Sequence, residues 1–326
     1  MTSDIFGMGN LLMDYIVELD DSSLIKFNLK KGICTLIDEK DLLKLKQELK
    51  DQIMIKTPGG STANVLHTFS ILGQKATLFG AVGKDEVGEE YFDLTSSNNL
   101  TPLFSKSQKH TGTAITIITP DKERSFAVYL GAAIDINLVD LDLDALKKSK
   151  YLFVGGHELV DNRINKIYLK ALDIAKENKV KICIDLADPF VVEQNKDFLK
   201  KIVSEYASIL FANKEEAQLL TSKKSDEAII KELSTLADVS IYKLGEEGSI
   251  IVNKGIFHKI KPFKVKVKDT TGAGDSYAGA FLYGVSKNLS IQKSGELASF
   301  ISSKIVSQIG ARFKNKPEIQ NIIGEK

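Results

Sequence analysis

Short apolar runs that alternate with helical patterns constrain the fold of this 326-residue chain more than any other feature. Apolar runs of this length are typical of buried parallel strands, and the helical patterns between them are typical of right-handed crossovers. The expected strands cover 75–80, 151–154, 181–186, 208–212 and 239–243, and the expected helices cover 62–72, 165–178, 198–204, 214–220 and 226–236. This order predicts an α/β fold with helices on both faces of a central, mostly parallel sheet.

Two segments, 12–56 and 111–130, depart from this alternation of strands and helices. In the second, alternating residues at 113–118 and a strand-like run at 124–129 flank a turn at 120–123, which is the pattern of a β-hairpin. Because hairpins are foreign to a right-handed βαβ winding, we expect both segments to form a small β-sheet that stands off the main one as a lid. The expected lid covers approximately 12–56 and 103–131, inserted in a single domain of residues 1–326.

Composition restricts the partners of the chain. With 44 Lys and Arg against 43 Asp and Glu, its formal charge is +1, so no global field attracts nucleic acid or an anionic membrane. Cys34 and Cys183 lie far apart without metal-ligand spacing, which favours free thiols in a reducing compartment. We find neither a leader-like amino terminus nor an apolar run long enough to cross a membrane. The expected protein is cytoplasmic, with a small-molecule partner and no nucleic acid or membrane partner.

The strongest chemical signal is the segment Asp269-Thr-Thr-Gly-Ala-Gly-Asp275. Two glycines directly precede a helical run, so free N–H groups at the helix start can face an anion. Asp275 then falls in the first helical turn beside that anion, where a carboxylate can take the proton of an attacking hydroxyl. The alternative for so short a motif is a plain turn with Asp275 as a capping residue.

The fourteen residues 269–282 closely resemble the second signature of the ribokinase-like carbohydrate kinases, the pfkB family. In that family the Gly-Ala-Gly stretch forms an anion hole for the transferred phosphate, and the Asp is the catalytic base. The resemblance assigns these roles to Gly272, Ala273, Gly274 and Asp275. It implies a ribokinase-like three-layer α/β/α sandwich with a small β-sheet lid, and an ATP-dependent phosphotransferase with an alcohol group as acceptor.

A second segment, Pro58-Gly-Gly-Ser-Thr-Ala-Asn64, precedes a helical pattern and looks like the first signature of the same family. Its glycines let the backbone approach a ligand, and the amide of Asn64 offers donors and an acceptor. The alternative is a glycine hinge with a helix cap. The resemblance implies substrate binding by Gly59, Gly60, Ser61 and Asn64.

The segment Ala212-Asn-Lys-Glu-Glu216 follows an apolar run, which places it at the carboxyl edge of the sheet. It resembles the family's Asn-x-x-Glu element, which organises Mg²⁺ near the phosphates. Mg²⁺ keeps several waters, so Asn213 and Glu216 are expected to bind it through water. The alternative is a capping box between the same two residues.

The remaining expectations for the nucleotide site lie between 240 and 315, the part of the chain expected to carry ATP. A Gly-x-x-Gly turn after the strand at 239–243 resembles the family's turn near the nucleotide. The expected cofactor-binding residues, in addition to Asn213, are Lys243, Gly245, Gly248 and Thr270.

Arg124 lies in the expected lid hairpin and is one of only three arginines, with Arg163 and Arg312. A guanidinium brought down by lid closure would stabilise the charge on a phosphoryl group in transfer, so we count Arg124 among the catalytic candidates. The alternative is a solvated surface charge.

Within the family, the chain resembles the adenosine kinase branch most closely. Phe6-Gly-Met-Gly-Asn10-Leu-Leu-Met-Asp14 looks like that branch's opening strand, in which the Asp binds two ribose hydroxyls and the Asn lies nearby. The resemblance also implies apolar contacts to a base from Leu36, Phe126 and Phe190. His157 and Cys34 differ from the residues that adenosine kinases of the animal type carry on the side that recognises the base. The resemblance therefore supports binding of a ribose more strongly than binding of an adenine. His157 follows an apolar run and is expected to line the pocket.

Two further functions stay open at this point. A sugar kinase of the same family would act on a free sugar or sugar acid of the ribose, fructose or 2-keto-3-deoxygluconate type. A ligand-binding module would keep the fold without the chemistry. The sequence also leaves open a monomer or a homodimer, and the K⁺ that the family often requires near its anion hole.

Overall fold

The large sheet organises the molecule, as seen in a computed structural model that describes residues 3–121 and 123–324. In the described part of the chain it has nine strands in the order β14-β13-β12-β11-β10-β9-β1-β5-β6. All neighbours from β6 to β12 are parallel, and β13 and β14 close the edge as antiparallel strands. The strands are β1 (Ile5–Met8), β5 (Ala76–Gly83), β6 (Leu100–Ser107), β9 (Tyr151–Gly155), β10 (Lys181–Asp185), β11 (Ile209–Asn213), β12 (Val239–Lys243), β13 (Ser249–Asn253) and β14 (Ile256–Ile260).

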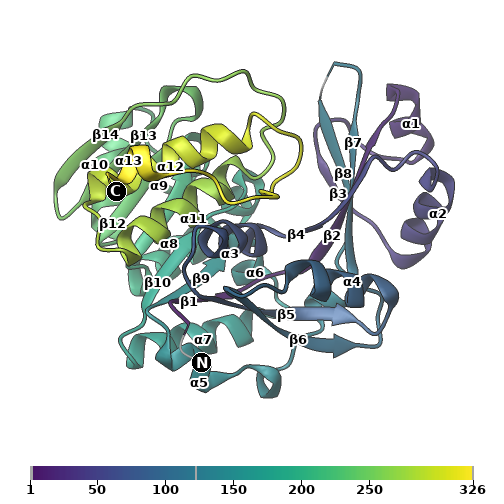
Figure 1. The fold of residues 1–326 in the computed structure, drawn as a ribbon, viewed down its shortest axis with the longest axis horizontal. Helices are drawn as coiled ribbons and strands as arrows, with labels where there is room; N and C mark the ends of the chain where they lie inside the picture. The colour runs from purple at the N-terminus through teal and green to yellow at the C-terminus, as the bar shows by residue number, and fades with distance from the viewer. Residues whose placement is uncertain (1–2, 122, 325–326) are drawn as a thin grey trace.

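Helices cover both faces of this sheet (Figure 1). Along β9, Phe153 packs with one helical layer, whereas Leu152 and Val154 pack with the other, as the alternation of side chains along a strand requires. The first layer contains α3 (Ser61–Ile71), α11 (Ala273–Ser286) and α12 (Ile291–Ile305). The second contains α5 (Leu143–Lys148), α6 (Gly156–Val160), α7 (Asn165–Glu177), α8 (Pro189–Tyr206), α9 (Lys214–Thr221) and α10 (Asp226–Leu236).

A five-stranded sheet stands off the large one, in the order β3-β8-β7-β2-β4 (Figure 1). The hairpin expected in this region is present, because β7 and β8 pair antiparallel from Thr113 with Tyr129 to Ile118 with Arg124. Position 122, in the expected turn, lies outside the described residues. The elements of this lid are β2 (Leu12–Glu18), α1 (Asp21–Lys26), β3 (Cys34–Leu36), α2 (Glu39–Leu49), β4 (Ile55–Gly59), β7 (Gly112–Ile118) and β8 (Arg124–Tyr129).

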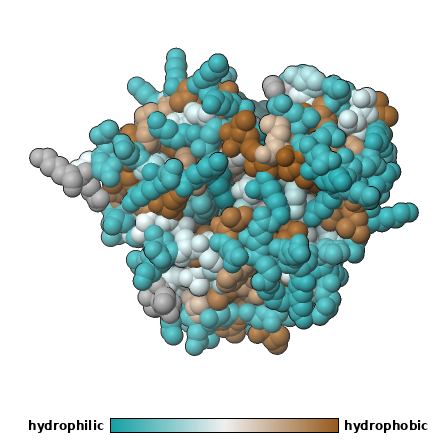
Figure 2. Space-filling model, turned by 45° about the vertical axis from the view of Figure 1, so that its right-hand side comes forward, coloured by the Kyte–Doolittle hydropathy of each residue, from teal (hydrophilic) through white to brown (hydrophobic). Residues whose placement is uncertain are grey.

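One expected lid boundary is wrong. Residues 103–107 were expected in the lid, but they form the end of β6 in the large sheet, because the parallel pairing of β6 with β5 continues as far as Gly83 and Ser107. The lid joins the large sheet through α4 (Glu86–Thr95), which packs against β4 as well as β5 and β6. Figure 2 shows apolar side chains gathered near the top of the view, where the two lobes meet.

The remaining elements are short connections. They are the 3₁₀ turns η1 (Gly131–Ile134), η2 (Leu138–Asp140) and η3 (Gly245–Glu247), and the helix α13 (Gln320–Ile323) near the carboxyl terminus. No helix in the described ranges combines the length and apolarity needed to cross a membrane.

Candidate active site

The two glycine-containing segments, more than 200 residues apart in sequence, meet where α3 packs against α11. Asp275 lies in the first turn of α11, and its carboxylate accepts a hydrogen bond from Ser61 Oγ at 2.6 Å and another from Asn64 Nδ2 at 3.0 Å. Burial raises the pKa of Asp275 above its ordinary value, and the two hydrogen bonds oppose that rise. The carboxylate is thus held in a fixed place with both oxygens engaged.

The turn before α11 depends on glycine at its first position. Gly272 has φ +73° as the N-cap of α11, and a Cβ at this position would lie 2.5 Å from Ala311 Cβ. Only glycine fits this left-handed, crowded turn. The first-turn N–H groups of a helix have no acceptor within the helix, and here the helix begins at the wall of a cavity of about 900 Å³. Gly272, Ala273, Gly274 and Asp275 all line that cavity.

Polar residues that line the same cavity end three neighbouring strands. Asp185 ends β10, Asn213 ends β11 and Lys243 ends β12, so their side chains share the carboxyl edge of the sheet. Lys243 Nζ lies 3.1 Å from Asp185 Oδ2, and it lies 3.2 Å from where a Cβ of Gly274 would be. Burial disfavours the charge of Lys243, but the nearby carboxylates of Asp185 and Glu216 hold its pKa above the ordinary value. An ammonium group therefore faces the first turn of α11.

Asn213 and Glu216 form a complete capping box at the start of α9. Glu216 N donates to Asn213 Oδ1 at 2.9 Å, while the Glu216 carboxylate accepts from Asn213 N at 2.8 Å and from Asn213 Nδ2 at 2.7 Å. Burial raises the pKa of Glu216 to about 7, and the charge of Lys243 opposes the rise. The capping alternative is therefore present in the structure, and both residues also line the cavity. Within the described chain, no group of three or more His, Cys, Asp or Glu side chains is arranged to hold a metal directly.

Asp14 extends from lid strand β2 toward the same centre. Its carboxylate lies about 2.1 to 2.3 Å from where a Cβ of Gly59 would be, so the side chain fits only because that residue is glycine. Gly60 has φ +90°, and a Cβ there would meet the Asn10 carbonyl oxygen at 2.2 Å. Burial raises the pKa of Asp14 to about 7; the guanidinium of Arg312 opposes the rise, and the carboxylate of Asp275 adds to it.

Arg124 is not a solvated charge. Its side chain is 15% exposed, its Nη2 lies 2.6 Å from Asp269 Oδ1, and its Nη1 donates to Thr271 Oγ1. Asp269 also accepts from Thr271 N at 2.7 Å and from Gly310 N at 2.7 Å. The lid arginine is therefore tied to the loop that leads into α11, and not to the carboxylate of Asp275.

The four residues expected around a base are more scattered. Leu36 and Phe190 are exposed by 64% and 69%, His157 is exposed on α6, and Phe126 is partly buried on β8. The described hydrogen bonds and ring contacts do not join any of them to Asp14 or Asp275. The other expected nucleotide residues, Gly245, Gly248 and Thr270, line the cavity.

Three residues of this centre were missed from the sequence. Asp185 lies one residue before the end of the strand expected at 181–186, and its position near the carboxyl edge of the sheet was a signal that could have found it. Glu158 directly follows His157 and accepts from Asn10 N at 2.9 Å, so it fixes the loop before Asp14. Arg312 contacts Asn64 and Gly59 from the carboxyl-terminal loop, and no motif marked it.

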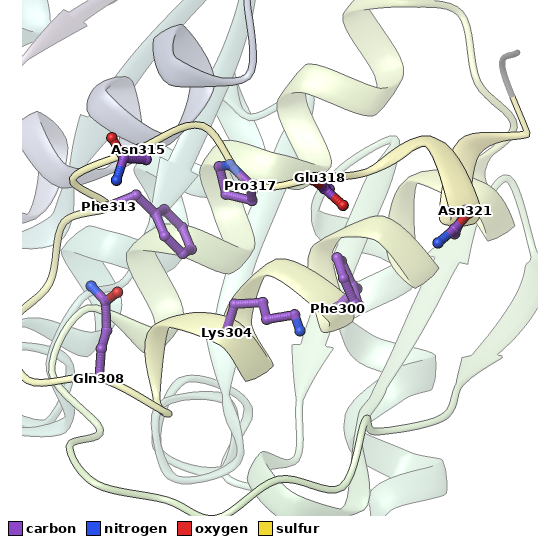
Figure 3. A pocket seen from close by; sticks show the side chains of 8 residues that line it. All are labelled: Phe300, Lys304, Gln308, Phe313, Asn315, Pro317, Glu318 and Asn321. Atoms are coloured by element: carbon purple, nitrogen blue, oxygen red, sulfur yellow. The ribbon is translucent and has the colours of Figure 1, made fainter.

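A second cavity, of about 580 Å³, lies outside this centre (Figure 3). The side chains in Figure 3 come from α12, the loop after it and α13, and Lys304 Nζ lies 5.0 Å from the centre of the Phe300 ring. Its lining residues are Phe300, Lys304, Gln308, Phe313, Asn315, Pro317, Glu318 and Asn321.

A ribokinase-like sandwich with a β-sheet lid and a carboxylate at a glycine-rich helix start defines a phosphotransferase that acts on small molecules. The model of the pfkB family carbohydrate kinases matches residues 28–318, and the chain belongs to that family. The family assignment made from the sequence is thereby confirmed.

Relatives within the family divide between two kinds of kinase. The 5-dehydro-2-deoxygluconokinase of Clostridium beijerinckii is 30% identical over 264 residues, which cover 76% of this chain and 78% of the relative. The adenosine kinase of Saccharomyces cerevisiae is 26% identical over 338 residues, which cover 97% of this chain and 98% of the relative. The crystal structure of adenosine kinase from Sinorhizobium meliloti is similar with a TM-score of 0.88 at 26% identity, covering 97% of both chains. The chain is thus a sugar or nucleoside kinase of the pfkB family.

Proposed function

We propose that the protein transfers the γ-phosphate of ATP to a primary hydroxyl of a ribonucleoside, with adenosine as the first acceptor to test and Asp275 as the general base. The observation that carries the proposal is the position of Asp275, held by Ser61 and Asn64 in the first turn of α11 beside Asp14. The acceptor oxygen attacks the γ-phosphorus as its proton passes to the Asp275 carboxylate. The bond to the bridging β-phosphate oxygen breaks, and ADP leaves.

The larger cavity supports ATP as the phosphoryl donor. Its polar end combines the helix start of Gly272 to Gly274 with the ammonium of Lys243, a pair suited to phosphates. Its other walls carry apolar side chains on which an adenine can rest: Pro262, Phe263, Val265, Val267 and Val306. A nucleotide placed this way directs its terminal phosphate toward Asp275.

The oxygen ligands at the polar end also fit Mg²⁺. Both Glu216 oxygens already accept N–H groups from Asn213, so Glu216 and Asp185 would hold the ion through its waters. Bound there, the ion would neutralise charge on the phosphates.

Two observations favour a nucleoside over a sugar acid as acceptor. Adenosine kinase from yeast matches 97% of the chain, whereas the 5-dehydro-2-deoxygluconokinase of C. beijerinckii matches 76% of it. Arg312, the cation beside Asp14, already contacts Asn64, so a substrate carboxylate would bring a second negative group to one guanidinium. A carboxylate at Asp14 instead suits two vicinal hydroxyls, which donate to it.

The sugar-acid kinase stays a second candidate, because the C. beijerinckii relative is 30% identical. The test is to measure kcat/KM for adenosine, 2′-deoxyadenosine, ribose, fructose and 5-dehydro-2-deoxygluconate with ATP and Mg²⁺. We expect adenosine to be the best acceptor, and we expect kcat/KM for 2′-deoxyadenosine to be lower by roughly 10²-fold or more. The reason is that polar groups of the site that bind the 2′-hydroxyl are left without a hydrogen-bond partner when it is absent. Asp14→Ala should remove much of that difference. A preference for 5-dehydro-2-deoxygluconate would reject the proposal of a nucleoside acceptor, and the proposal of a kinase would remain.

A further inference from the structure

Arg312 joins the lid strand to the body helix of the candidate site. Its Nε donates to Asn64 Oδ1 at 2.9 Å, and its Nη2 donates to the Gly59 carbonyl oxygen at 3.5 Å. Gly59 ends β4 of the lid, and Asn64 lies in α3 of the large lobe. A single planar guanidinium therefore fixes two substrate-side elements relative to one another.

The contact with Arg312 decides which way the Asn64 amide faces. A guanidinium only donates hydrogen bonds, so the Asn64 atom against it must be the carbonyl oxygen. The amide nitrogen then faces Asp275, to which it donates at 3.0 Å. In the flipped orientation, two donors would face each other at Arg312 and two acceptors at Asp275. Arg312 thereby controls a hydrogen bond of the proposed base without touching it.

Arg312 is itself held in place by its own loop. Gln308 Nε2 donates to the Arg312 carbonyl oxygen at 2.8 Å, and Gly310 N donates to Asp269. His67 Nε2 lies 2.9 Å from the Phe313 carbonyl oxygen, and burial lowers the pKa of His67 to about 4, so the neutral ring donates Nε2–H to that oxygen. Gln308 and Phe313 also line the second cavity (Figure 3).

Arg312 Nη1 and Asn10 Oδ1 are both buried without a hydrogen-bond partner in the described structure. One is a donor and the other an acceptor, and both belong to residues that contact the Gly59-Gly60 turn. Leaving such groups unpaired is costly, unless a ligand satisfies them. A hydroxyl group of a ligand can accept from Arg312 Nη1, and a hydroxyl group can likewise donate to Asn10 Oδ1.

We propose that Arg312 is a positioning residue that orients Asn64 toward Asp275 and that also donates, through Nη1, to a hydroxyl of the acceptor beside Asp14. The assignment rests on the proposed kinase function, and it adds a specificity contact from the carboxyl-terminal loop. The charged groups that face Asp14 are Arg312 and Asp275; Tyr91 on α4 also faces it, with a pKa that burial raises to about 12, and His67 on α3 is neutral.

The test compares Arg312→Lys and Arg312→Gln with Arg163→Gln, a control at an exposed arginine paired with Asp161 in its own loop. Both Arg312 variants should lower kcat/KM for the best acceptor by roughly 10²-fold, the usual effect of a small misplacement of reacting groups. Arg312→Gln should also move the acidic limb of the kcat/KM profile to higher pH, because Asp14 loses the cation that favours its charged form. Arg312→Lys keeps a positive charge, so the acidic limb of its kcat/KM profile should stay near the wild-type position.

If both Arg312 variants have wild-type kinetics and an unshifted acidic limb of the kcat/KM profile, the role assigned to Arg312 is overturned, and the proposed kinase function is unaffected. If the wild type phosphorylates no acceptor, the kinase proposal fails, and a ¹³C-carboxyl NMR titration of Asp14 then decides the role of Arg312. That signal, assigned with Asp14→Asn, should titrate at higher pH in Arg312→Gln than in wild type. An identical titration would overturn the coupling. Thermal melting checks that each variant is folded.

Discussion

Asp275 and Asp14 are two carboxyl groups that share one centre but have different surroundings. Asp275 receives hydrogen bonds from Ser61 and Asn64, which favour its charged form. Burial raises the pKa of Asp14 to about 7, and the guanidinium of Arg312 only partly offsets that rise. Two carboxyl groups in different surroundings can divide the work of base and binder.

The raised pKa of Asp14 predicts a pH-dependent stability. Because folding raises this pKa from about 4 to about 7, the folded state prefers the protonated carboxyl. The stability that Asp14 contributes is therefore fully present below about pH 4 and is lost as the pH rises through about 7. Asp14→Asn removes this loss. The free energy of unfolding of the variant minus that of wild type should therefore be larger at about pH 8 than at about pH 5. Urea denaturation at both pH values measures the difference, and an equal difference at both would contradict the burial of this carboxyl.

At the scale of single elements, the capping box at the start of α9 has two possible uses, helix cap and Mg²⁺ binding. Glu216→Gln keeps the size of the side chain but leaves an NH₂ group where a carboxylate oxygen accepted from Asn213. We expect a loss of about 1 kcal/mol in stability from the weakened cap. We also expect a several-fold rise in the Mg²⁺ concentration for half-maximal rate, since an amide holds the water shell less well.

Glu215→Gln is the matched control, because Glu215 is exposed on the same helix and outside the cavity lining. It should leave both quantities unchanged. An unaltered Mg²⁺ dependence in Glu216→Gln, with the stability loss present, would reduce this element to a helix cap.

The lid hairpin is a second element whose role can be tested. Arg124 attaches β8 to Asp269 and Thr271, which precede α11, so removing it should release the hairpin from the body. Arg124→Ala should speed hydrogen exchange of the β7 and β8 amides and lower kcat, since the proposed transfer needs a closed, dry site. Arg163→Ala should change neither. Unchanged exchange in the hairpin would show that the arginine does not hold the lid.

Across the whole molecule, the sequence predicted local pattern well and distant contacts poorly. The periodicity of helices and strands was enough to predict helical layers on both faces of the sheet. The two glycine-containing segments were enough to bring Asp275, Ser61 and Asn64 into the set of candidate site residues. The lid boundary at 103 was wrong because a strand at the edge of a parallel sheet and a strand of a small lid have the same local pattern. Arg312 was missed because its contacts to Gly59 and Asn64 span about 250 residues and no spacing rule reports them.

The proposed chemistry as a whole depends on Asp275, and one comparison tests it most directly. AMP formation from adenosine, ATP and Mg²⁺ is measured for wild type, for Asp275→Asn and for Asp51→Asn, a control at an exposed carboxylate. Adenosine binding is measured in parallel by calorimetry. We predict that wild type and the control form AMP, and that Asp275→Asn binds adenosine but loses roughly 10²- to 10⁴-fold in kcat, the usual contribution of a positioned base. A kcat for Asp275→Asn within a few-fold of wild type would contradict the assignment of Asp275 as the base.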